Sequence, residues 1–371
     1  MLDAKELGKM SKASNVEKIA FKTRVADSKK GMMLLDYLCE RFNYHSRDKW
    51  KENIKNGEIE INGRLADAKV TLFPGDQIAY VTTKRAEPKV PKNIPILFED
   101  KDLLIVNKPA HIPVHPGGKY LQNTLISLLR SQAKKSDLLI LAHRLDRETS
   151  GVCVINKTPL AKEKMYWKFF NREVDKKYWA LTWGTPNPRK GKIDIPIGAA
   201  TLKGKPDLSQ IRIKQMARGY KSKKATTKYK VLSTSWFEQS HWSPPEWPDI
   251  LKVQNAGEHR WPISLVECEP QTGRTNQIRV HLAEIGCGIV GDKLYDPKED
   301  IFLGMTQQKP VLEGDSEPAG PRLDKEFRAR MVLDAQALHA RSLRFRHPRT
   351  SRWLEVEAPA PKSWKGLYKS P

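Results

Sequence analysis

A charged segment between two apolar runs is the feature that most constrains how this chain can fold. Residues 138–141 read Leu-Leu-Ile-Leu and residues 152–155 read Val-Cys-Val-Ile, and both runs predict short buried strands. Between them, residues 143–151 read His-Arg-Leu-Asp-Arg-Glu-Thr-Ser-Gly, a density of charge that is costly to bury without partners. The segment is therefore either a solvated surface turn or a charge cluster at a cleft, and taken alone it favours the turn.

The same segment resembles the catalytic loop of the RluA-type RNA pseudouridine synthases, His-Arg-Leu-Asp-x-x-Thr-Ser-Gly. Three more segments resemble that family in the same order: the Lys-Pro loop at Lys108, the strand with Tyr178, and residues 272–281 with Arg279. The resemblance covers residues 96–358. It implies an α+β fold, a mixed and mostly antiparallel sheet with flanking helices and a central cleft, preceded by a small S4-like α/β domain.

The resemblance implies that a uridine in RNA is isomerised to pseudouridine. The N-glycosidic bond breaks, the uracil turns and a C–C glycosidic bond forms, so no cofactor and no metal is expected. The family's carboxylate at the position of Asp146 is essential, as nucleophile or as base, and the sequence leaves both roles open. The arginine matching Arg279 pairs with it, and the tyrosine matching Tyr178 stacks on the target base, which must flip out to reach Asp146.

Six more side chains are expected to bind substrate: Arg144, His143, Arg147, Lys108, Asn276 and Arg274. Arg144 is a candidate to fill the stack that the flipped base vacates, while His143 and Arg147 are expected to hold the loop or touch phosphate. Asn276 stands where the family usually has His, so a cationic role is excluded there. Each catalytic candidate also has a structural reading, with Asp146 as a turn cap, Tyr178 as packing and Arg279 as a surface arginine.

The sequence predicts five segments along the chain. They are a flexible basic arm (1–20), an S4-like RNA-binding domain (21–85), a proline-rich linker (86–95), the catalytic domain (96–358) and a tail (359–371). Residues 236–262 and 297–332 interrupt the catalytic domain as irregular, proline-containing insertions. The roles of these two insertions stay open.

Residues 21–85 predict two helices followed by a hairpin. Ser46 is an acceptable N-cap for the second helix, which ends near Gly57, and Asn62-Gly63 is a hairpin-type turn. This order resembles the S4 domain, in which a basic helical face docks on RNA. In this chain the basic face would be formed by Arg47, Lys49, Lys51 and Lys55. The alternative is that these residues form an ordinary solvated helix surface.

The catalytic segment predicts helices over residues 121–133 and 159–174 and a strand over residues 176–184. Alternation along that strand puts Trp179, Leu181 and Trp183 toward the core and Tyr178 on the other face. A further helix is expected to begin at a cap on Thr275 and to end at Gly286.

The net charge of the chain indicates which class of molecule it binds. The chain has 66 Lys+Arg against 43 Asp+Glu, and its net charge of +23 predicts attraction to a polyanion, most often nucleic acid. Four cysteines without a C-x-x-C pair indicate reduced thiols. Without a transmembrane stretch or a signal-peptide core, we expect a cytoplasmic monomer that binds RNA and no membrane.

Two classes of function remain open. The first is an active synthase whose target is ribosomal RNA, which the S4-like segment and the charge favour, or transfer RNA. The second is a non-catalytic RNA-binding or ribosome-assembly factor on a synthase scaffold, supported only by Asn276 and the two insertions. Pseudouridine mapping with an Asp146→Ala variant would separate the two classes.

Overall fold

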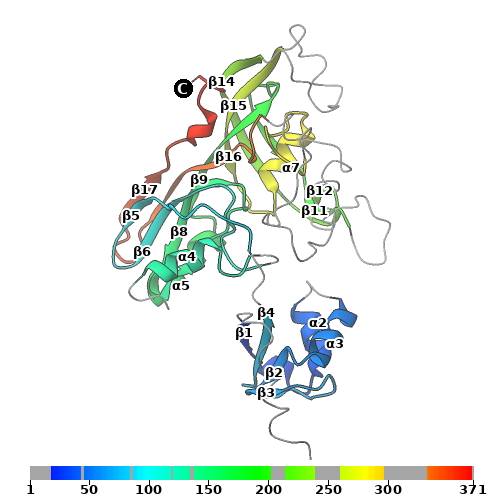
Figure 1. The fold of residues 1–371 in the computed structure, drawn as a ribbon. Helices are drawn as coiled ribbons and strands as arrows, with labels where there is room; N and C mark the ends of the chain where they lie inside the picture. The colour runs from blue at the N-terminus through cyan, green and yellow to red at the C-terminus, as the bar shows by residue number, and fades with distance from the viewer. Residues whose placement is uncertain are drawn as a thin grey trace, which may run out of the picture. The chain divides into compact units, whose positions relative to one another are not determined.

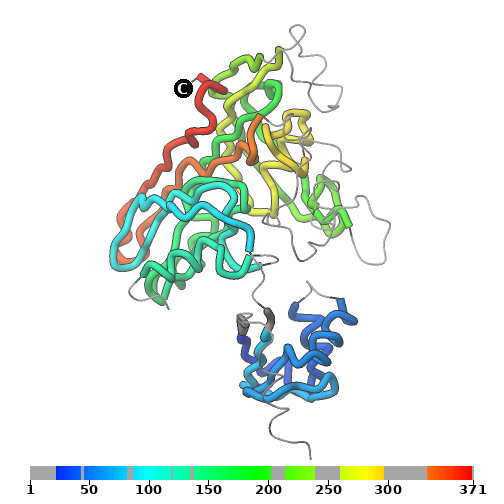
Figure 2. The backbone as a smooth tube through the Cα atoms, viewed as in Figure 1, coloured from blue at the N-terminus to red at the C-terminus, as the bar shows by residue number. Residues whose placement is uncertain are grey.

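The structure, a computed structural model, describes residues 18–42, 46–83, 87–117, 120–133, 138–201, 214–238, 260–295 and 332–369. The chain divides into two compact units, Met1–Ala86 and Glu87–Pro371 (Figures 1 and 2). The predicted arm up to residue 17 and most of both predicted insertions lie outside the described residues. Among the helices that are described, none combines the length and apolarity that a membrane span requires.

The first unit packs two helices on a four-stranded antiparallel sheet of order β1-β4-β2-β3. Its elements are β1 (Lys18–Arg24), η1 (Asp27–Lys29), α2 (Leu34–Arg41), α3 (Arg47–Lys55), β2 (Ile59–Ile61), β3 (Arg64–Leu65) and β4 (Gln77–Thr83). Ser46 caps α3 as predicted, because its hydroxyl accepts the Lys49 N–H at 3.2 Å. Strand β1 pairs with β4 from Lys18 onward, so residues 18–20 belong to an edge strand of the sheet and not to a flexible arm.

A ten-stranded mixed sheet organises the second unit, in the order β10-β14-β15-β9-β16-β8-β6-β5, with β17 on β16 and β7 on β8. The strands are β5 (Ile96–Glu99), β6 (Leu103–Lys108), β7 (Ile140–Leu141), β8 (Ser150–Asn156), β9 (Asp175–Trp183), β10 (Lys190–Asp194), β14 (Thr226–Glu238), β15 (Arg260–Pro270), β16 (Leu338–Arg346) and β17 (Trp353–Glu357). Only β16 and β8 pair in parallel among these described strands. The predicted mixed, mostly antiparallel sheet is confirmed.

A small second sheet of order β12-β11-β13 joins β11 (Ile197–Ala199), β12 (Gln215–Ala217) and β13 (Tyr220–Lys223). The described residues of the unit also form helices α4 (Leu125–Gln132), α5 (Pro159–Phe170) and α7 (Gln277–Glu284) and the short η3 (Lys362–Trp364). Successive side chains of a strand point to opposite faces. On β6, Leu104 therefore packs with α4 and Leu103 with α5, so these two helices cover opposite faces of the sheet.

Strand β9 departs from the predicted one-sided burial. Leu181 and Trp183 are buried as expected, but Ala180 and Thr182 from the other face are buried as well. In this central strand between β15 and β16, Ala180 and Leu181 from opposite faces both pack into the core cluster that includes Ile278 of α7. Tyr178 packs partly against the cores on both sides of this strand.

The predicted linker is packed onto the second unit. The Glu87 carboxylate accepts backbone N–H bonds from Leu121, Gln122 and Asn123 at 2.8 to 3.0 Å. Val90 packs against the apolar cluster of α4. Residues 87–95 therefore belong to the second unit, because their polar and apolar groups both find partners there.

The predicted tail is packed too. Trp364 is buried in the core beside β9, with Leu367 and Tyr368 packed against the same cluster. The Ser233 hydroxyl donates to the Lys369 carbonyl at 2.7 Å. The end of the chain thus closes one side of the sheet instead of extending from it.

Candidate active site

The carboxylate of the charged loop and the arginine of α7 meet, as the resemblance implies. Asp146 Oδ2 accepts a hydrogen bond from Arg279 Nη1 at 3.1 Å, between residues 133 positions apart. The Asp146 side chain is 38% exposed and that of Arg279 is 11% exposed. A substrate can therefore reach the carboxylate, while the cation behind it is shielded.

Arg279 is held in place by Asp292, a residue to which the sequence assigned no role. Asp292 Oδ2 accepts from Nε at 2.7 Å and Oδ1 accepts from Nη2 at 2.8 Å, so the pairing is bidentate and fixes the guanidinium plane. Burial lowers the pKa of Arg279, but Asp292 and then Asp146 raise it above its usual value. The guanidinium stays charged and presents Nη1 to Asp146.

Asn276 begins α7 and joins Arg279 to Tyr295. Its Oδ1 accepts from Arg279 Nη1 at 3.1 Å, and its Nδ2 donates to the Tyr295 hydroxyl at 3.0 Å. The backbone at Asn276 is left-handed, with φ +57°, a conformation that Asn tolerates better than most residues. The predicted cap at Thr275 is wrong, because Asn276 flanks the helix and turns its side chain toward the arginine.

Tyr295 lies against the same guanidinium, with its ring centroid 5.0 Å from Arg279 Cζ. Burial raises the pKa of Tyr295 to about 12, so the hydroxyl is protonated at neutral pH. It also accepts the backbone N–H of Gln215 on β12 at 3.2 Å. The arginine is therefore held by a buried carboxylate, an amide and an aromatic ring.

Tyr178 lies on β9 near Asp146. Burial, and then the neighbouring Asp146 charge, raise the pKa of Tyr178 well above its usual value. The phenol is therefore neutral. The half-buried ring packs beside Leu145 and offers a flat apolar surface next to the carboxylate, which suits stacking on a uracil base.

His143 holds the start of the loop. Its Nε2 accepts the Val154 N–H at 3.1 Å, and its ring lies 5.0 Å from that of Phe169, centroid to centroid. Burial, and then the Lys176 cation, lower the pKa of His143 to about 4, so the ring is neutral and keeps its acceptor nitrogen. Of the two predicted roles, the contacts support holding the loop.

The position of Lys108 contradicts its predicted role in binding substrate. It is fully buried, and Nζ donates to the carbonyls of Pro109 at 2.9 Å, Ile112 at 2.8 Å and Arg147 at 3.0 Å. Burial lowers its pKa to about 7, but only the ammonium has the three N–H groups that these carbonyls occupy. Lys108 therefore ties the Lys-Pro loop to the charged loop, and it cannot contact a substrate.

The charges that follow Asp146 are neutralised inside the protein. Arg147 donates to Glu148 at 2.7 Å and to the Tyr120 hydroxyl at 3.0 Å, and Lys293 donates to Glu148 at 2.8 Å. Burial raises the pKa of Glu148, but Lys293 and Arg147 together hold it below its usual value. Glu148 is thus an ionised anchor, and Arg147 is engaged in holding the loop.

The end of the loop is fastened to β16. The Ser150 hydroxyl lies 2.8 Å from His339 Nδ1. Gly151 has φ +107°, and a Cβ there would lie 2.2 Å from the Ala340 carbonyl oxygen. The parallel approach of β8 and β16 therefore requires glycine at this position.

The two remaining arginine candidates lie at the margin of the site. Arg144 is exposed, and within the described part of the chain its guanidinium forms no hydrogen bond or ion pair. Arg274 is half-buried and donates from Nε to the Lys224 carbonyl at 3.1 Å. Arg144 is therefore available to RNA, while Arg274 mainly fixes the loop before α7.

The basic residues predicted to bind RNA in the first unit lie on α3. Arg47 pairs with Asp36 at 2.7 Å and Lys49 with Glu52 at 2.9 Å. Lys51 and Lys55 are exposed. The face is accessible to solvent, as both of its predicted readings require.

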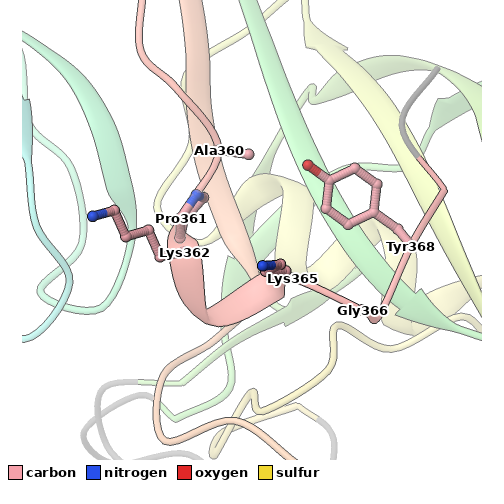
Figure 3. Close-up of a pocket in the computed structure, with 6 residues that line it drawn as sticks. All are labelled: Ala360, Pro361, Lys362, Lys365, Gly366 and Tyr368. Atoms are coloured by element: carbon pink, nitrogen blue, oxygen red, sulfur yellow. The ribbon is translucent and has the colours of Figure 1, made fainter.

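A hollow elsewhere in the second unit is separate from this cluster (Figure 3). It is lined by Ala360, Pro361, Lys362, Lys365, Gly366 and Tyr368. Neither Asp146 nor Arg279 contributes to it. The candidate active site is therefore defined by the ion pair and its supports, not by this hollow.

Known proteins resemble this chain along most of its length. The family described as RNA pseudouridylate synthase matches residues 102–284. An uncharacterized RNA pseudouridine synthase of Chlorobaculum parvum is 30% identical over 337 residues, 88% of this chain and 90% of its own. Ribosomal large subunit pseudouridine synthase D of Vibrio cholerae is 28% identical over 346 residues, covering 91% and 90%.

A solved structure shares the fold. Human RNA pseudouridylate synthase domain containing 1 superposes with a TM-score of 0.51 at 24% identity, over 76% of this chain and 90% of its own. The family match contains Asp146, Tyr178 and Arg279 and leaves the first unit outside it.

Proposed function

This chain belongs to the RNA pseudouridine synthase family, and we propose that it isomerises uridine in ribosomal RNA with Asp146 as the reacting carboxylate. The observation that carries the proposal is the Asp146–Arg279 ion pair at 3.1 Å. In the loop around it, His143, Arg147 and Glu148 are held by partners within the protein. Asp146 is thus the accessible anion of a rigid loop.

Asp146 acts as nucleophile or as base, and both roles need an ionised carboxylate. The adjacent Arg279 cation pairs with that carboxylate at 3.1 Å. Asp292 and Asn276 hold the guanidinium still, so the carboxylate does not have to reorganise when substrate binds. After the N-glycosidic bond breaks, the uracil turns and forms its C–C bond within this fixed frame.

The target uridine must leave its stack to reach Asp146. The neutral ring of Tyr178 stacks on the flipped uracil and limits its movement during the turn. Arg144 is exposed and, within the described residues, without a side-chain partner, which supports its placement in the vacated position of the RNA. These roles give the neutral ring near Asp146 and the exposed guanidinium of Arg144 separate tasks on the RNA.

Ribosomal RNA is the favoured substrate for two reasons. The net charge of +23 and the exposed basic face of α3 suit a large structured RNA, with the first unit acting as an S4-like RNA-binding domain. A relative from Vibrio cholerae is named for the large ribosomal subunit. The proposal places a monomeric enzyme in the cytoplasm with that RNA, and transfer RNA is the alternative target for the same chemistry.

The first prediction tests the carboxylate. We expect Asp146→Asn to lower pseudouridine formation by at least about 10²–10⁴-fold without unfolding the protein, because the amide can neither attack nor accept a proton as the carboxylate does. Pseudouridines are mapped in total RNA of a deletion strain that carries wild-type protein, Asp146→Asn, or the exposed-site control Asp175→Asn. Wild type and control should restore the same ribosomal sites.

Two outcomes contradict the proposal. Restoration of every site by Asp146→Asn would remove the carboxylate from the mechanism. Wild-type protein that isomerises no uridine in any cellular RNA would favour the non-catalytic assembly factor. Restored sites confined to transfer RNA would instead select the alternative substrate.

A further inference from the structure

Helix α5 carries an exposed aromatic cluster that the reaction at Asp146 does not use. Tyr166, Trp167 and Phe170 are 57%, 49% and 66% exposed. Their rings contact one another, with centroid distances of 5.3 Å, 6.0 Å and 5.5 Å. Contiguous apolar patches of this kind are uncommon on protein surfaces and mark binding sites.

Packing does not explain the cluster. Helix α5 attaches to the sheet through Ala161 and Met165, which are fully buried, with Phe169 partly buried beside them. Tyr166 and Phe170 follow one another four residues apart on the solvent face, where polar side chains would suffice for folding. The three aromatic rings therefore suggest a binding partner rather than a core.

The surroundings of the cluster are basic. Residues 159–177 contain six Lys or Arg against three Asp or Glu. Lys162, Lys164 and Arg172 are exposed, while Lys168 pairs with Glu173. Protein interfaces are depleted in lysine at their centres, whereas single-stranded nucleic acid combines bases that stack on aromatic rings with phosphates that attract cations.

The cluster lies outside the base-binding site but connects to its loop. Phe169 contacts His143, which precedes Asp146 in the charged loop. Helix α5 covers the face of the sheet opposite α4, whereas Leu145 packs on the α4 side. A strand bound to the cluster is therefore a part of the RNA other than the target uridine.

We propose that Tyr166, Trp167 and Phe170 bind single-stranded RNA that flanks the target uridine by stacking on its bases. The proposal rests on the RNA substrate inferred above and adds a second attachment point for it. It assigns the cluster to substrate affinity and not to chemistry.

Trp353 on β17 provides a matched control. It is also half exposed, but its ring already lies 4.6 Å from the guanidinium of Arg344 and 4.4 Å from that of Arg346. Its faces are therefore engaged by the protein's own cations. An exposed tryptophan of this kind should contribute little to RNA binding.

The test compares alanine and leucine replacements of all three cluster residues in the full chain. Binding of a fluorescein-labelled oligouridine is measured by anisotropy at fixed salt. We expect both triple variants to weaken binding at least about tenfold, because stacking needs an aromatic ring, and Trp353→Ala to change it less than about twofold. Thermal melts verify that the variants are folded, and sedimentation reports their association state.

The outcomes separate this inference from the proposed function. Unchanged oligouridine binding in both triple variants overturns the inference. Weakened binding with alanine but not with leucine also overturns it and points to an apolar protein partner, as does a wild-type dimer that both triple variants abolish.

Activity gives the second readout, with ribosomal RNA from the deletion strain as substrate. We expect a higher KM and an unchanged kcat in the triple variants if the cluster holds flanking RNA. If the wild-type protein itself formed no pseudouridine, the proposed function would be refuted. Oligouridine binding would still test whether the aromatic cluster binds RNA.

Discussion

Residues 143–151 and helix α3 are both short and rich in charge, yet their charges are stabilised in different ways. On α3, Lys49 pairs with Glu52 and Lys51 with Asp48, three residues away and in solvent. In the loop, Asp146 pairs with Arg279 and Glu148 with Lys293, partners 133 and 145 residues away in part-buried surroundings. The loop and α3 have a similar density of charge. They differ in how far away in the sequence the partners lie and in how deeply the pairs are buried.

The energetic expectation follows from that difference. An exposed ion pair contributes about 0–1 kcal/mol, whereas removing one partner of a buried pair costs about 3–5 kcal/mol. Substitutions that remove a buried support of the loop should therefore destabilise the protein strongly, whereas substitutions on α3 should change RNA binding with little effect on folding.

The largest effect is expected at Gly151. A Cβ there would lie 2.2 Å from the Ala340 carbonyl oxygen, at a φ of +107°, so Gly151→Ala must separate β8 from β16. We expect a loss of more than about 4 kcal/mol in unfolding free energy. Gly117→Ala is the control, because nothing lies within 4 Å of its added Cβ. Equal denaturation midpoints for the two variants would contradict this account of the loop.

The next effect is expected at Asp292. Asp292→Asn leaves the buried Arg279 without its bidentate carboxylate, so we expect a loss of about 3–5 kcal/mol and a lower kcat. The α3 counterpart is Asp36→Asn, which removes the exposed partner of Arg47 and should leave the unfolding free energy nearly unchanged. Urea unfolding of both variants measures the contrast, and similar losses would remove the distinction between the two regions.

A third effect depends on pH. The pKa of His143 is lowered from 6.5 to about 4, so between these pH values the unfolded chain binds a proton that the folded chain does not. The stability from neutral His143 is complete above pH 6.5 and is lost as pH falls toward 4, by up to about 3 kcal/mol. His143→Gln keeps an acceptor for Val154 N–H without this titration.

Unfolding free energies measured from pH 4 to 7 test that dependence. The unfolding free energy should depend less steeply on pH in His143→Gln than in the wild-type protein. This difference separates the contribution of His143 from that of His339, whose pKa is also lowered to about 4. Identical slopes would show that His143 does not titrate in this range. Helix α3 has no histidine and should contribute nothing to either slope.

The smallest effect on stability is expected on α3 itself. Combined Arg47→Ala, Lys51→Ala and Lys55→Ala should leave the unfolding free energy nearly unchanged, because all three side chains are exposed. RNA affinity should fall, and the dependence of log K on log salt should become shallower by about one for each phosphate that the helix no longer neutralises. Lys101→Ala is an exposed lysine control. An unchanged salt dependence would favour the solvated-surface reading of this helix.

Local patterns in the sequence predicted much of the fold. Ser46 caps α3, and the apolar run at residues 152–155 lies within a fully buried strand. These signals depend on neighbours within a few residues, which a sequence displays directly. The Asp146–Arg279 contact was predicted only through the family resemblance, because no local pattern joins residues 133 positions apart.

The errors have the opposite cause. From the sequence, Lys108 is predicted to bind substrate, and the error shows only when its three carbonyl partners are known, one of them 39 positions away. Asp292 was visible as part of Gly291-Asp292, but its role follows only from the burial of Arg279. A buried arginine needs an acceptor, and this requirement could have directed attention to a nearby aspartate.

The central strand of the large sheet follows every other described strand of that sheet except β17 in the chain. Strand β16 (Leu338–Arg346) joins β9 to β8, and both of these neighbouring strands precede it in the chain. On the ribosome, both halves of the sheet emerge before the strand that unites them, and such long-range pairing is slow to form. Until then Ser150 and Gly151 have no β16 to fasten them. The nascent chain therefore carries the complete loop sequence before β16 is available to hold the end of the loop.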